Sequence, residues 1–292
     1  MFHFDYFRAN HIEEVCSFLQ QHGDKSRILA GGTDLMVQIH EKDPKWAQLE
    51  WVVDISALQK ELRYVREEET EVHIGALSTH TDLETSPVIQ EYFPLLSAAC
   101  ASVGSPQIRN MGTIGGSICN ASPAADPLTP LIACDASIVL QGVDGRRTLL
   151  LSDFYLGKGQ VDLQPGEFVV EFVVPKLPCK AVTRFEKLGR RKALAISRLN
   201  AAVVLKYNEQ KQIEFARVVA GCIFTKPKRL TEMENLLVGK TISRELFEQA
   251  GKAVSEEMIR VTGYRWSTEY KQPALEGLME RALLTAAEME LE

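Results

Sequence analysis

Two short glycine-rich segments are the most promising places for chemistry in this sequence. The first is "LAGGTDLM" at residues 29–36, and the second is "GTIGGSI" at residues 112–118. In each, a Gly-Gly pair lies close to a threonine, Thr33 or Thr113, so several backbone N–H groups and one hydroxyl could approach an anion together. Two such loops could hold the two phosphates of a dinucleotide. Taken singly, each segment could also be only a tight turn.

A carboxylate follows the second segment, at Asp126 in "SPAADP". Because a carboxylate repels phosphate, a functional role for Asp126 would be to hold a hydroxyl, such as a ribose or ribityl OH. The alternative is an Asx-turn ahead of Pro127. Asp34 is similarly ambiguous, because it could simply cap the N-terminus of a helix.

Other kinds of site are disfavoured. The six cysteines contain no CxxC pair, and the six histidines all lie within the first eighty residues without a metal-ligand spacing. We therefore expect reduced thiols in a cytoplasmic protein, with no metal site and no iron–sulfur cluster on this chain. The net charge of −6 argues against nucleic-acid binding. The sequence has neither a signal-peptide pattern nor an apolar run long enough to span a membrane.

The elements around the first loop form an α/β unit. Apolar spacing predicts a helix over residues 12–22, ending at Gly23. Strands are predicted at "RILA", directly before the first glycine loop, and at residues 51–55.

The middle of the chain, from about residue 60 to 175, is rich in predicted strands at 71–77, 136–142, 146–151 and 168–175. "DGRR" at 144–147 predicts a hairpin turn. A helix is expected to begin near Pro94 and to end at Gly104.

The "PKLPCK" segment at 175–180 is the best domain boundary. Beyond it we expect three antiparallel strands at 181–189, 200–207 and 212–223, followed by helices at about 243–262 and 272–290. Pro273 fits the first turn of the last helix. The fold class is therefore α+β.

Three segments in this order, "LAGGTDLM", "IRNMGTIGGSICNASPAADP" and "FEKLGRRKALAIS", resemble the FAD-binding medium subunit of the molybdenum hydroxylases, the family of xanthine, carbon monoxide and nicotinate dehydrogenases. The resemblance covers essentially the whole chain. It implies a p-cresol methylhydroxylase/vanillyl-alcohol oxidase (PCMH/VAO) type of FAD-binding domain at 1–176, made of two α/β subdomains at about 1–57 and 58–176. It also implies a C-terminal α/β domain at 180–292 with a small antiparallel sheet and helices.

The resemblance also implies a set of FAD-binding residues and no catalytic side chain. The implied residues are Leu29, Ala30, Gly31, Gly32, Thr33, Asp34, Leu35 and Met36 in the first loop, Thr113, Ile114, Gly115, Gly116 and Ser117 in the second, and Val103, Gly104, Asp126, Val169 and Lys187 elsewhere.

The roles of these residues follow from the same resemblance. Both loops embrace the FAD diphosphate, and Val103 and Gly104 line the adenine side. Val169 is a further apolar contact, Asp126 holds a ribose or ribityl hydroxyl, and Lys187 lies near the flavin ring, unless it is only an exposed strand lysine. One departure is Ser117, where the family commonly has asparagine; a hydroxyl can still make one hydrogen bond.

In the family that the sequence resembles, three subunits form an electron relay. Substrate is hydroxylated at a molybdopterin centre on a large subunit. Electrons then cross two [2Fe–2S] clusters on a small subunit, reach FAD on a chain like this one, and leave to an acceptor such as NAD.

Several alternatives stay open at the level of sequence. The chain could be a self-contained flavoprotein oxidase or reductase of the same fold, or a non-catalytic assembly subunit that has lost FAD. Arg190, Arg191 and Lys192 could dock a partner or a nucleotide acceptor, or form a solvated turn. Cys119 could approach the flavin or be a small buried hydrophobe.

Overall fold

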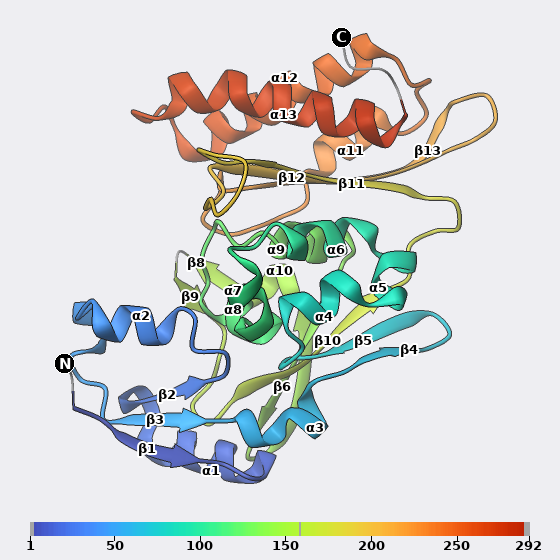
Figure 1. Cartoon of the computed structure of the whole chain (residues 1–292). Helices are drawn as coiled ribbons and strands as arrows, with labels where there is room; N and C mark the ends of the chain where they lie inside the picture. Colours follow the sequence, from blue (N-terminus) through green and yellow to red (C-terminus); the bar gives the residue numbers. More distant parts are fainter. Residues whose placement is uncertain (1–2, 158, 289–292) are drawn as a thin grey trace.

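The computed structural model of the protein describes residues 3–157 and 159–288. At its N-terminus lies a three-stranded parallel sheet with strand order β1-β3-β2 (Figure 1). Its elements are β1 (Asp5–Arg8), α1 (Ile12–His22), β2 (Ser26–Leu29), α2 (Leu35–His40) and β3 (Trp51–Asp54). The predicted helix and both predicted strands are confirmed. Strand β1 was not predicted, because four largely exposed residues carry no clear alternation of apolar and polar side chains.

Helix α1 ends where the sequence predicts. Gly23 follows it with φ +51°, a conformation that glycine adopts without a steric penalty. The helix buries Val15, Cys16 and Leu19, which pack with Val53 of β3 and fix the strand that precedes the first glycine loop.

The middle of the molecule is a five-stranded antiparallel sheet with the order β4-β5-β10-β6-β7. Its strands are β4 (Val65–Glu67), β5 (Glu71–Gly75), β6 (Ser137–Gly142), β7 (Gly145–Leu150) and β10 (Phe168–Pro175). The four strands that were predicted here are confirmed, and β6 and β7 form the predicted hairpin, in which Gly142 pairs with Gly145. Three short elements flank this sheet: α10 (Leu151–Phe154), β8 (Tyr155–Gly157) and β9 (Gln160–Val161).

Short helices form a layer between this sheet and the C-terminal part (Figure 1). These helices are α4 (His80–Thr85), α5 (Pro87–Tyr92), α6 (Pro94–Ala101), α7 (Pro106–Met111), α8 (Ile114–Cys119) and α9 (Leu128–Ala133), whereas α3 (Gln59–Leu62) lies outside the layer, next to β3. Proline at the first position of α5, α6 and α7 starts a new helix each time, which keeps these helices short. Helix α6 begins at Pro94 as predicted, but it ends at Ala101, because Ser102 and Val103 already bond three residues back.

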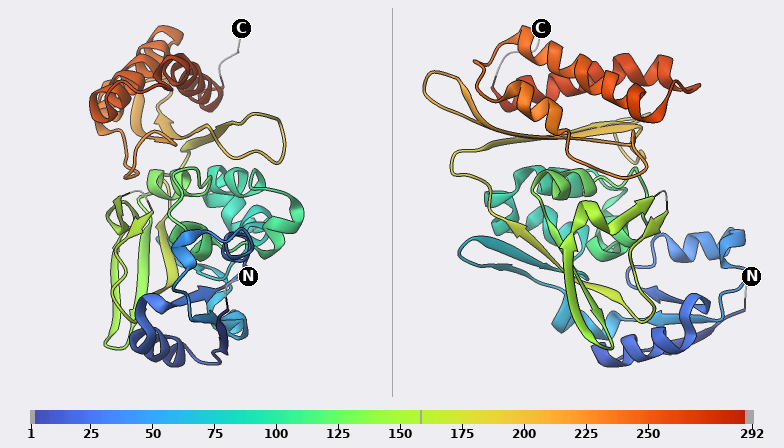
Figure 2. Two further views of the ribbon diagram at one scale, coloured as in Figure 1. Left: turned by 90° about the vertical axis from the view of Figure 1, so that its left-hand side faces the viewer. Right: turned by 180° about the vertical axis from the view of Figure 1, so that it is seen from behind.

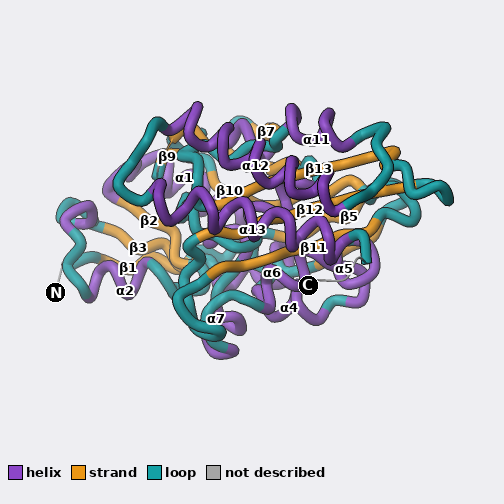
Figure 3. The backbone as a smooth tube through the Cα atoms, turned by 90° about the horizontal axis from the view of Figure 1, so that it is seen from above, coloured by secondary structure: helices purple, strands orange, loops and turns teal. Residues whose placement is uncertain are grey.

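The C-terminal part is a three-stranded antiparallel sheet covered by helices, as predicted. Its elements are β11 (Val182–Leu188), β12 (Leu199–Tyr207), β13 (Ile213–Gly221), α11 (Thr231–Leu237), α12 (Arg244–Thr262) and α13 (Thr268–Ala286). Figure 3 shows α12 and α13 crossing above the strands.

The predicted place of Pro273 is wrong. Helix α13 begins at Thr268, so Pro273 lies inside the helix and not in its first turn. The earlier start comes from the buried hydroxyl of Thr268, which accepts from the Arg265 N–H at 2.8 Å and fixes the turn that opens the helix.

The C-terminal sheet lies between two layers of helices (Figure 2), and its central strand β12 is buried on both faces. Because side chains alternate along a strand, Ala202 and Val204 of β12 point toward the helical layer below, where α6 and α9 lie. Ala201 and Val203 point the other way, into a second core with α12 and α13. The sheet therefore joins two hydrophobic cores.

Candidate cofactor site

The first glycine loop, between β2 and α2, presents a row of free backbone donors. Within the part of the chain that the structure describes, the N–H groups of residues 31–35 donate to no protein acceptor. Gly32 has φ +70°, which an L side chain rarely adopts. Consecutive free N–H groups in such a turn form a site for an anion.

The two glycine loops touch each other. A Cβ atom at Gly31 would lie 1.9 Å from the carbonyl oxygen of Met111 and 3.1 Å from the Cα of Gly112. A Cβ at Gly112 would lie 3.4 Å from the hydroxyl oxygen of Thr33. Only glycine allows this approach, so the structure brings together two segments that lie about eighty residues apart in the chain.

The second loop differs from the first, because its amides are already bonded. At the start of α8, the N–H groups of Ile114 and Gly115 donate to Ser78 and Ala76 carbonyls, both at 2.9 Å. The hydroxyl of Thr113 accepts from the Gly116 N–H at 3.1 Å. Gly115 is needed for packing, since its Cβ would lie 2.8 Å from the Ala76 oxygen.

Gly116 and Ser117 form the accessible surface of this second loop. Gly116 is exposed, and Ser117 is partly exposed. Within the described residues the Ser117 hydroxyl has no protein hydrogen-bond partner, although its backbone N–H donates to the Thr113 carbonyl. The Ser117 hydroxyl is thus free to make a further hydrogen bond.

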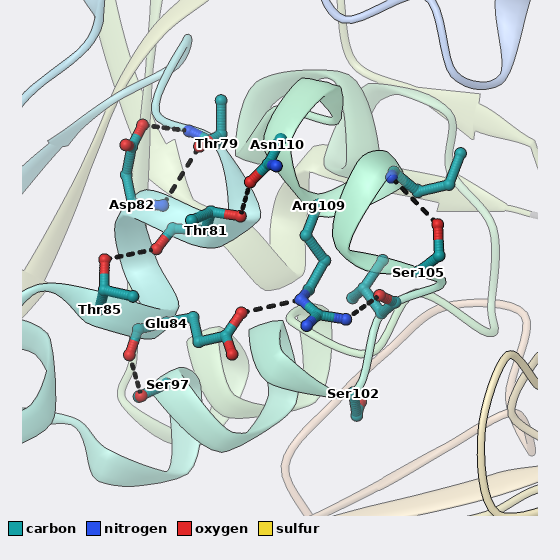
Figure 4. A network of polar contacts seen from close by, with 12 residues as sticks. Thr79, Thr81, Asp82, Glu84, Thr85, Ser97, Ser102, Ser105, Arg109 and Asn110 are labelled. Atoms are coloured by element: carbon teal, nitrogen blue, oxygen red, sulfur yellow. Dashed lines mark hydrogen bonds and ion pairs between the residues drawn. The ribbon is translucent and has the colours of Figure 1, made fainter.

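Helix α7 connects Gly104 to Gly112, and its side chains form hydrogen bonds with α4 (Figure 4). The Arg109 Nε donates to the Glu84 carboxylate at 2.8 Å, and its Nη1 donates to the Val103 carbonyl at 3.2 Å. One turn away, the Thr81 hydroxyl donates to the Asn110 side-chain oxygen at 2.6 Å. These contacts fix Gly104 before α7 and Gly112 after it.

His80, at the start of α4, is a residue that the sequence reasoning missed. Its side chain is buried, and its Cδ2 would lie 3.1 Å from a Cβ at Gly112. Burial, reinforced by the Arg109 charge, lowers the pKa of His80 to about 4, so its ring is neutral at pH 7. A single histidine at a helix start gives no signal in the sequence.

Asp126 and Lys187 form a buried ion pair with each other. The Lys187 Nζ donates to Asp126 Oδ2 at 2.5 Å and to the Ser102 carbonyl at 2.9 Å. The other oxygen, Oδ1, accepts from the Ser197 hydroxyl at 2.5 Å and from the Asn200 amide at 3.2 Å. The carboxylate therefore ties the loop after α8 to β11 and β12.

This geometry bears on the predicted roles of both residues. The Asp126 side chain makes no Asx-turn but bonds to distant parts of the chain, and Lys187 is not the exposed strand lysine of the alternative prediction. Oδ1 has two protein donors, whereas Oδ2 has one short donor, Lys187, because the single hydroxyl proton of Ser102 goes to the Ala99 carbonyl at 2.8 Å rather than to Oδ2 at 3.3 Å. Oδ2 therefore keeps an acceptor position for a further hydroxyl, and the role of Asp126 toward a ribose or ribityl hydroxyl stays a prediction.

Lys187 lies close to the segment that holds Val103 and Gly104. Lys187 bonds to the carbonyl of Ser102, the residue before Val103. Val103 and Gly104 are predicted on the adenine side, whereas Lys187 is predicted near the flavin ring. Both assignments stay predictions.

A cleft of about 920 Å³ opens between the α6–α7 segment and the loop after β11. Gly104 and Lys187 line it, together with Arg109, Arg281 and the basic segment Arg190, Arg191 and Lys192. Among the described residues, its lining contains no Asp, Glu, His, Cys or Tyr side chain.

The remaining predicted residues lie at the edges of the site or in the core. Val169 on β10 is only 5% exposed and packs in the core of the five-stranded sheet. Leu29, Leu35 and Met36 are half-buried around a small core that includes Ile39. Ala30 is partly buried and packs against the core of the parallel sheet. Asp34 is exposed at the start of α2, and its side chain makes no capping hydrogen bond.

Cys119 lies against the hydrophobic core, in agreement with the hydrophobe alternative. Burial raises the pKa of its thiol to about 12. In the described part of the chain, no helix has the length and apolar character to cross a membrane.

Comparisons with known proteins cover nearly the whole chain. The family described as "FAD binding domain in molybdopterin dehydrogenase" matches residues 2–177, and "CO dehydrogenase flavoprotein C-terminal domain" matches residues 184–286. The nicotinate dehydrogenase FAD-subunit of Eubacterium barkeri is 34% identical over 282 residues, which are 95% of this chain and 94% of that protein. The glyceraldehyde dehydrogenase medium chain of Sulfolobus acidocaldarius is 33% identical, covering 97% of this chain and 98% of that one.

A solved structure shows the same fold. A chain of carbon monoxide dehydrogenase from Hydrogenophaga pseudoflava, in a form that lacks the Mo-pyranopterin moiety of the molybdenum cofactor, superposes with a TM-score of 0.88. It is 31% identical, and the superposition covers 98% of this chain and 97% of that one. The two glycine loops, the α+β architecture and these matches agree, and the chain belongs to the FAD-binding medium subunits of the molybdenum hydroxylases, an oxidoreductase family.

Proposed function

We propose that this subunit carries electrons from [2Fe–2S] clusters of a small partner subunit, through FAD, to an external acceptor such as NAD. A large partner subunit with molybdopterin would oxidise the substrate. The observation that carries this proposal is the row of free N–H groups at residues 31–35, held against the Met111–Gly112 turn. Family membership supports the same function.

The residues present fit FAD. Its diphosphate carries two negative charges and needs several donors, which the amides of residues 31–35 and the hydroxyls of Thr33 and Ser117 supply. Gly104 and Lys187 line the cleft that would receive another part of the molecule. When bound, the flavin ring supplies the redox chemistry, since it can take up electrons singly and release them in pairs.

The chain itself has a binding and positioning role in this proposal. In the part of the chain that the structure describes, the cleft lining offers no carboxylate, imidazole, thiol or phenol that could act as a general base or nucleophile. This composition supports a subunit whose cofactor does the chemistry, and it disfavours a self-contained oxidase with its own acid–base group. The Asp126–Lys187 pair holds β11 against the helical layer and thereby shapes the cleft.

The proposal also includes the predicted domain boundaries and the predicted location in the cell. We place an FAD-binding domain at 1–176, with subdomains at about 1–57 and 58–176, and a C-terminal domain at 180–292. All six cysteines are free, which supports a reducing compartment and hence a cytoplasmic location.

The relay is tested on the heteromeric complex, purified anaerobically and reduced with dithionite. On mixing with NAD⁺, we expect the absorbance of oxidised flavin to return while NADH forms. Flavin that NAD⁺ does not reoxidise, but a quinone or ferredoxin does, would reject NAD as the acceptor. A complex that contains flavin but no [2Fe–2S] absorbance would reject the relay itself.

A further inference from the structure

Large exposed apolar side chains gather on two turns of the C-terminal part. Among the described residues fourteen large hydrophobic side chains are exposed, and six of them lie in residues 194–196 and 261–270. Trp266 is 94% exposed, Ile196 is 81% exposed and Tyr264 is 68% exposed. Scattered single apolar residues are ordinary on a protein surface, but a cluster of this kind marks an interaction site.

The two turns lie together and continue from the cleft. The guanidinium carbon of Arg198 is 5.6 Å from the centroid of the Tyr270 ring, which joins the β11–β12 loop to the start of α13. Both turns lie at the same end of the C-terminal part (Figure 1). Leu194 is half-exposed and also lines the cleft, so the apolar surface reaches the cleft mouth. We call the six apolar residues and Arg198 the aromatic band: Leu194, Ile196, Arg198, Val261, Tyr264, Trp266 and Tyr270.

The aromatic band has a positive border. Residues 189–198 carry Arg190, Arg191, Lys192 and Arg198 and no acidic residue. Within the described chain none of these four forms an ion pair; Arg191 donates only to the Leu194 carbonyl. The whole chain has a net charge of −6, so this segment is positively charged although the chain as a whole is negatively charged.

We propose that the aromatic band is the docking surface for an acidic face of the [2Fe–2S] subunit, which would lie over the mouth of the cleft. This inference rests on the proposed function. Exposed Trp, Tyr and Arg side chains are the types that dominate binding energy at protein interfaces. Uncompensated positive charge beside them favours an acidic partner and speeds its association. Lys187, which is predicted near the flavin ring, lines this cleft, so a partner at the cleft mouth would bring its cluster close to the ring.

A second copy of this chain fits the surface less well. In a two-fold contact the same surface meets itself, so the basic segments of both copies would face each other. Like charges brought together in this way are destabilising. The neighbouring turn, 261–270, carries one acid, Glu269, and one base, Arg265, so the surface as a whole stays positive.

The test uses the three-subunit complex, prepared with Trp266→Glu or Arg198→Glu in this chain. The matched control is Val143→Glu, since Val143 is 50% exposed in the β6–β7 turn and lies outside the aromatic band. Binding of the small subunit is measured by surface plasmon resonance, and iron and FAD are counted per chain after size exclusion. We expect Trp266→Glu and Arg198→Glu to weaken binding at least tenfold and to lower the iron content, with FAD still at one per chain.

Failure of the docking surface and failure of the proposed function give different results in this experiment. Unchanged binding in both variants overturns the docking surface, and so does an equal loss in the Val143→Glu control. The docking surface is also overturned if the isolated chain is a dimer that Trp266→Glu converts to monomers, because the occupant is then a second copy. Wild-type chain that binds no FAD overturns the proposed function. To exclude unfolding, Trp266→Phe, which keeps an aromatic ring, is expected to restore binding to within threefold.

Discussion

At the residue scale, glycines that look alike in the sequence have different tasks. Gly31 allows the two loops to touch, and Gly115 allows α8 to pack on Ala76, whereas Gly116 is exposed. The sequence predicted that both loops meet the same diphosphate, and this stays a prediction. What the structure adds is that the free N–H groups belong to the first loop.

Gly31→Ala is expected to weaken FAD binding at least tenfold. The new Cβ would lie 1.9 Å from the Met111 oxygen, so the two loops must move apart. The control is Gly277→Ala, where nothing lies within 4 Å in the interior of α13, and alanine there is expected to stabilise the protein by about 0.5–1 kcal/mol. Quenching of flavin fluorescence measures both affinities. Equal affinities for FAD would contradict the role of the loop contact.

Lys187→Met is expected to lower the free energy of unfolding by about 3–5 kcal/mol, because it leaves a buried carboxylate without its counter-charge. Adding Asp126→Asn should recover part of this loss. Urea denaturation of the two single variants and the double variant gives the coupling energy between these residues. Strictly additive effects would show that the two side chains do not interact in solution.

At the scale of elements, the sequence predicted those helices, strands and turns that depend on apolar periodicity and on turn-forming residues. Helix α1, the β6–β7 hairpin and strands β11 to β13 follow from local patterns. The short helices α5 and α7 did not, because six residues are too few to show a helical period. The bracing of α7 by Glu84 depends on a contact between residues 25 positions apart, which no local pattern reveals.

His80, between α4 and the Gly112 turn, is expected to make stability depend on pH. Its pKa is about 4 in the folded chain and about 6.5 in the unfolded chain, so between these values only the unfolded chain binds the proton. Stability from this group is therefore full above pH 6.5 and is lost as the pH falls toward 4, by about 3 kcal/mol.

Urea denaturation at pH 7 and pH 4.5 measures this dependence. His80→Gln should reduce the difference in stability between the two pH values, whereas His40→Gln, which changes an exposed histidine at the end of α2, should not. An unchanged difference in His80→Gln would mean that another group controls it.

At the scale of the whole molecule, the C-terminal sheet belongs to two cores at once. Ala202 and Val204 pack toward the helical layer, and Ala201 and Val203 pack toward α12 and α13. The sequence predicted the strands but not that both faces are buried, because near-continuous apolar strands fit either one covered face or two. The Asp126–Lys187 pair, 61 residues apart, could not be found from sequence spacing either.

The fragment 180–292 is expected to associate or aggregate when expressed alone. Without residues 1–179, the face with Phe185, Ala202 and Val204 is exposed to water. Size exclusion with light scattering measures its mass. A monomeric fragment with a cooperative thermal transition would show that the C-terminal part folds independently.

The central claim is that this chain holds FAD through its diphosphate. Apo-protein titrated with FAD and, separately, with FMN tests it most directly, because FMN has the same flavin ring but only one phosphate and no adenosine. The account predicts one FAD per chain, with FMN bound at least a hundredfold more weakly. Apo-protein that binds neither, or that binds both equally, would contradict it.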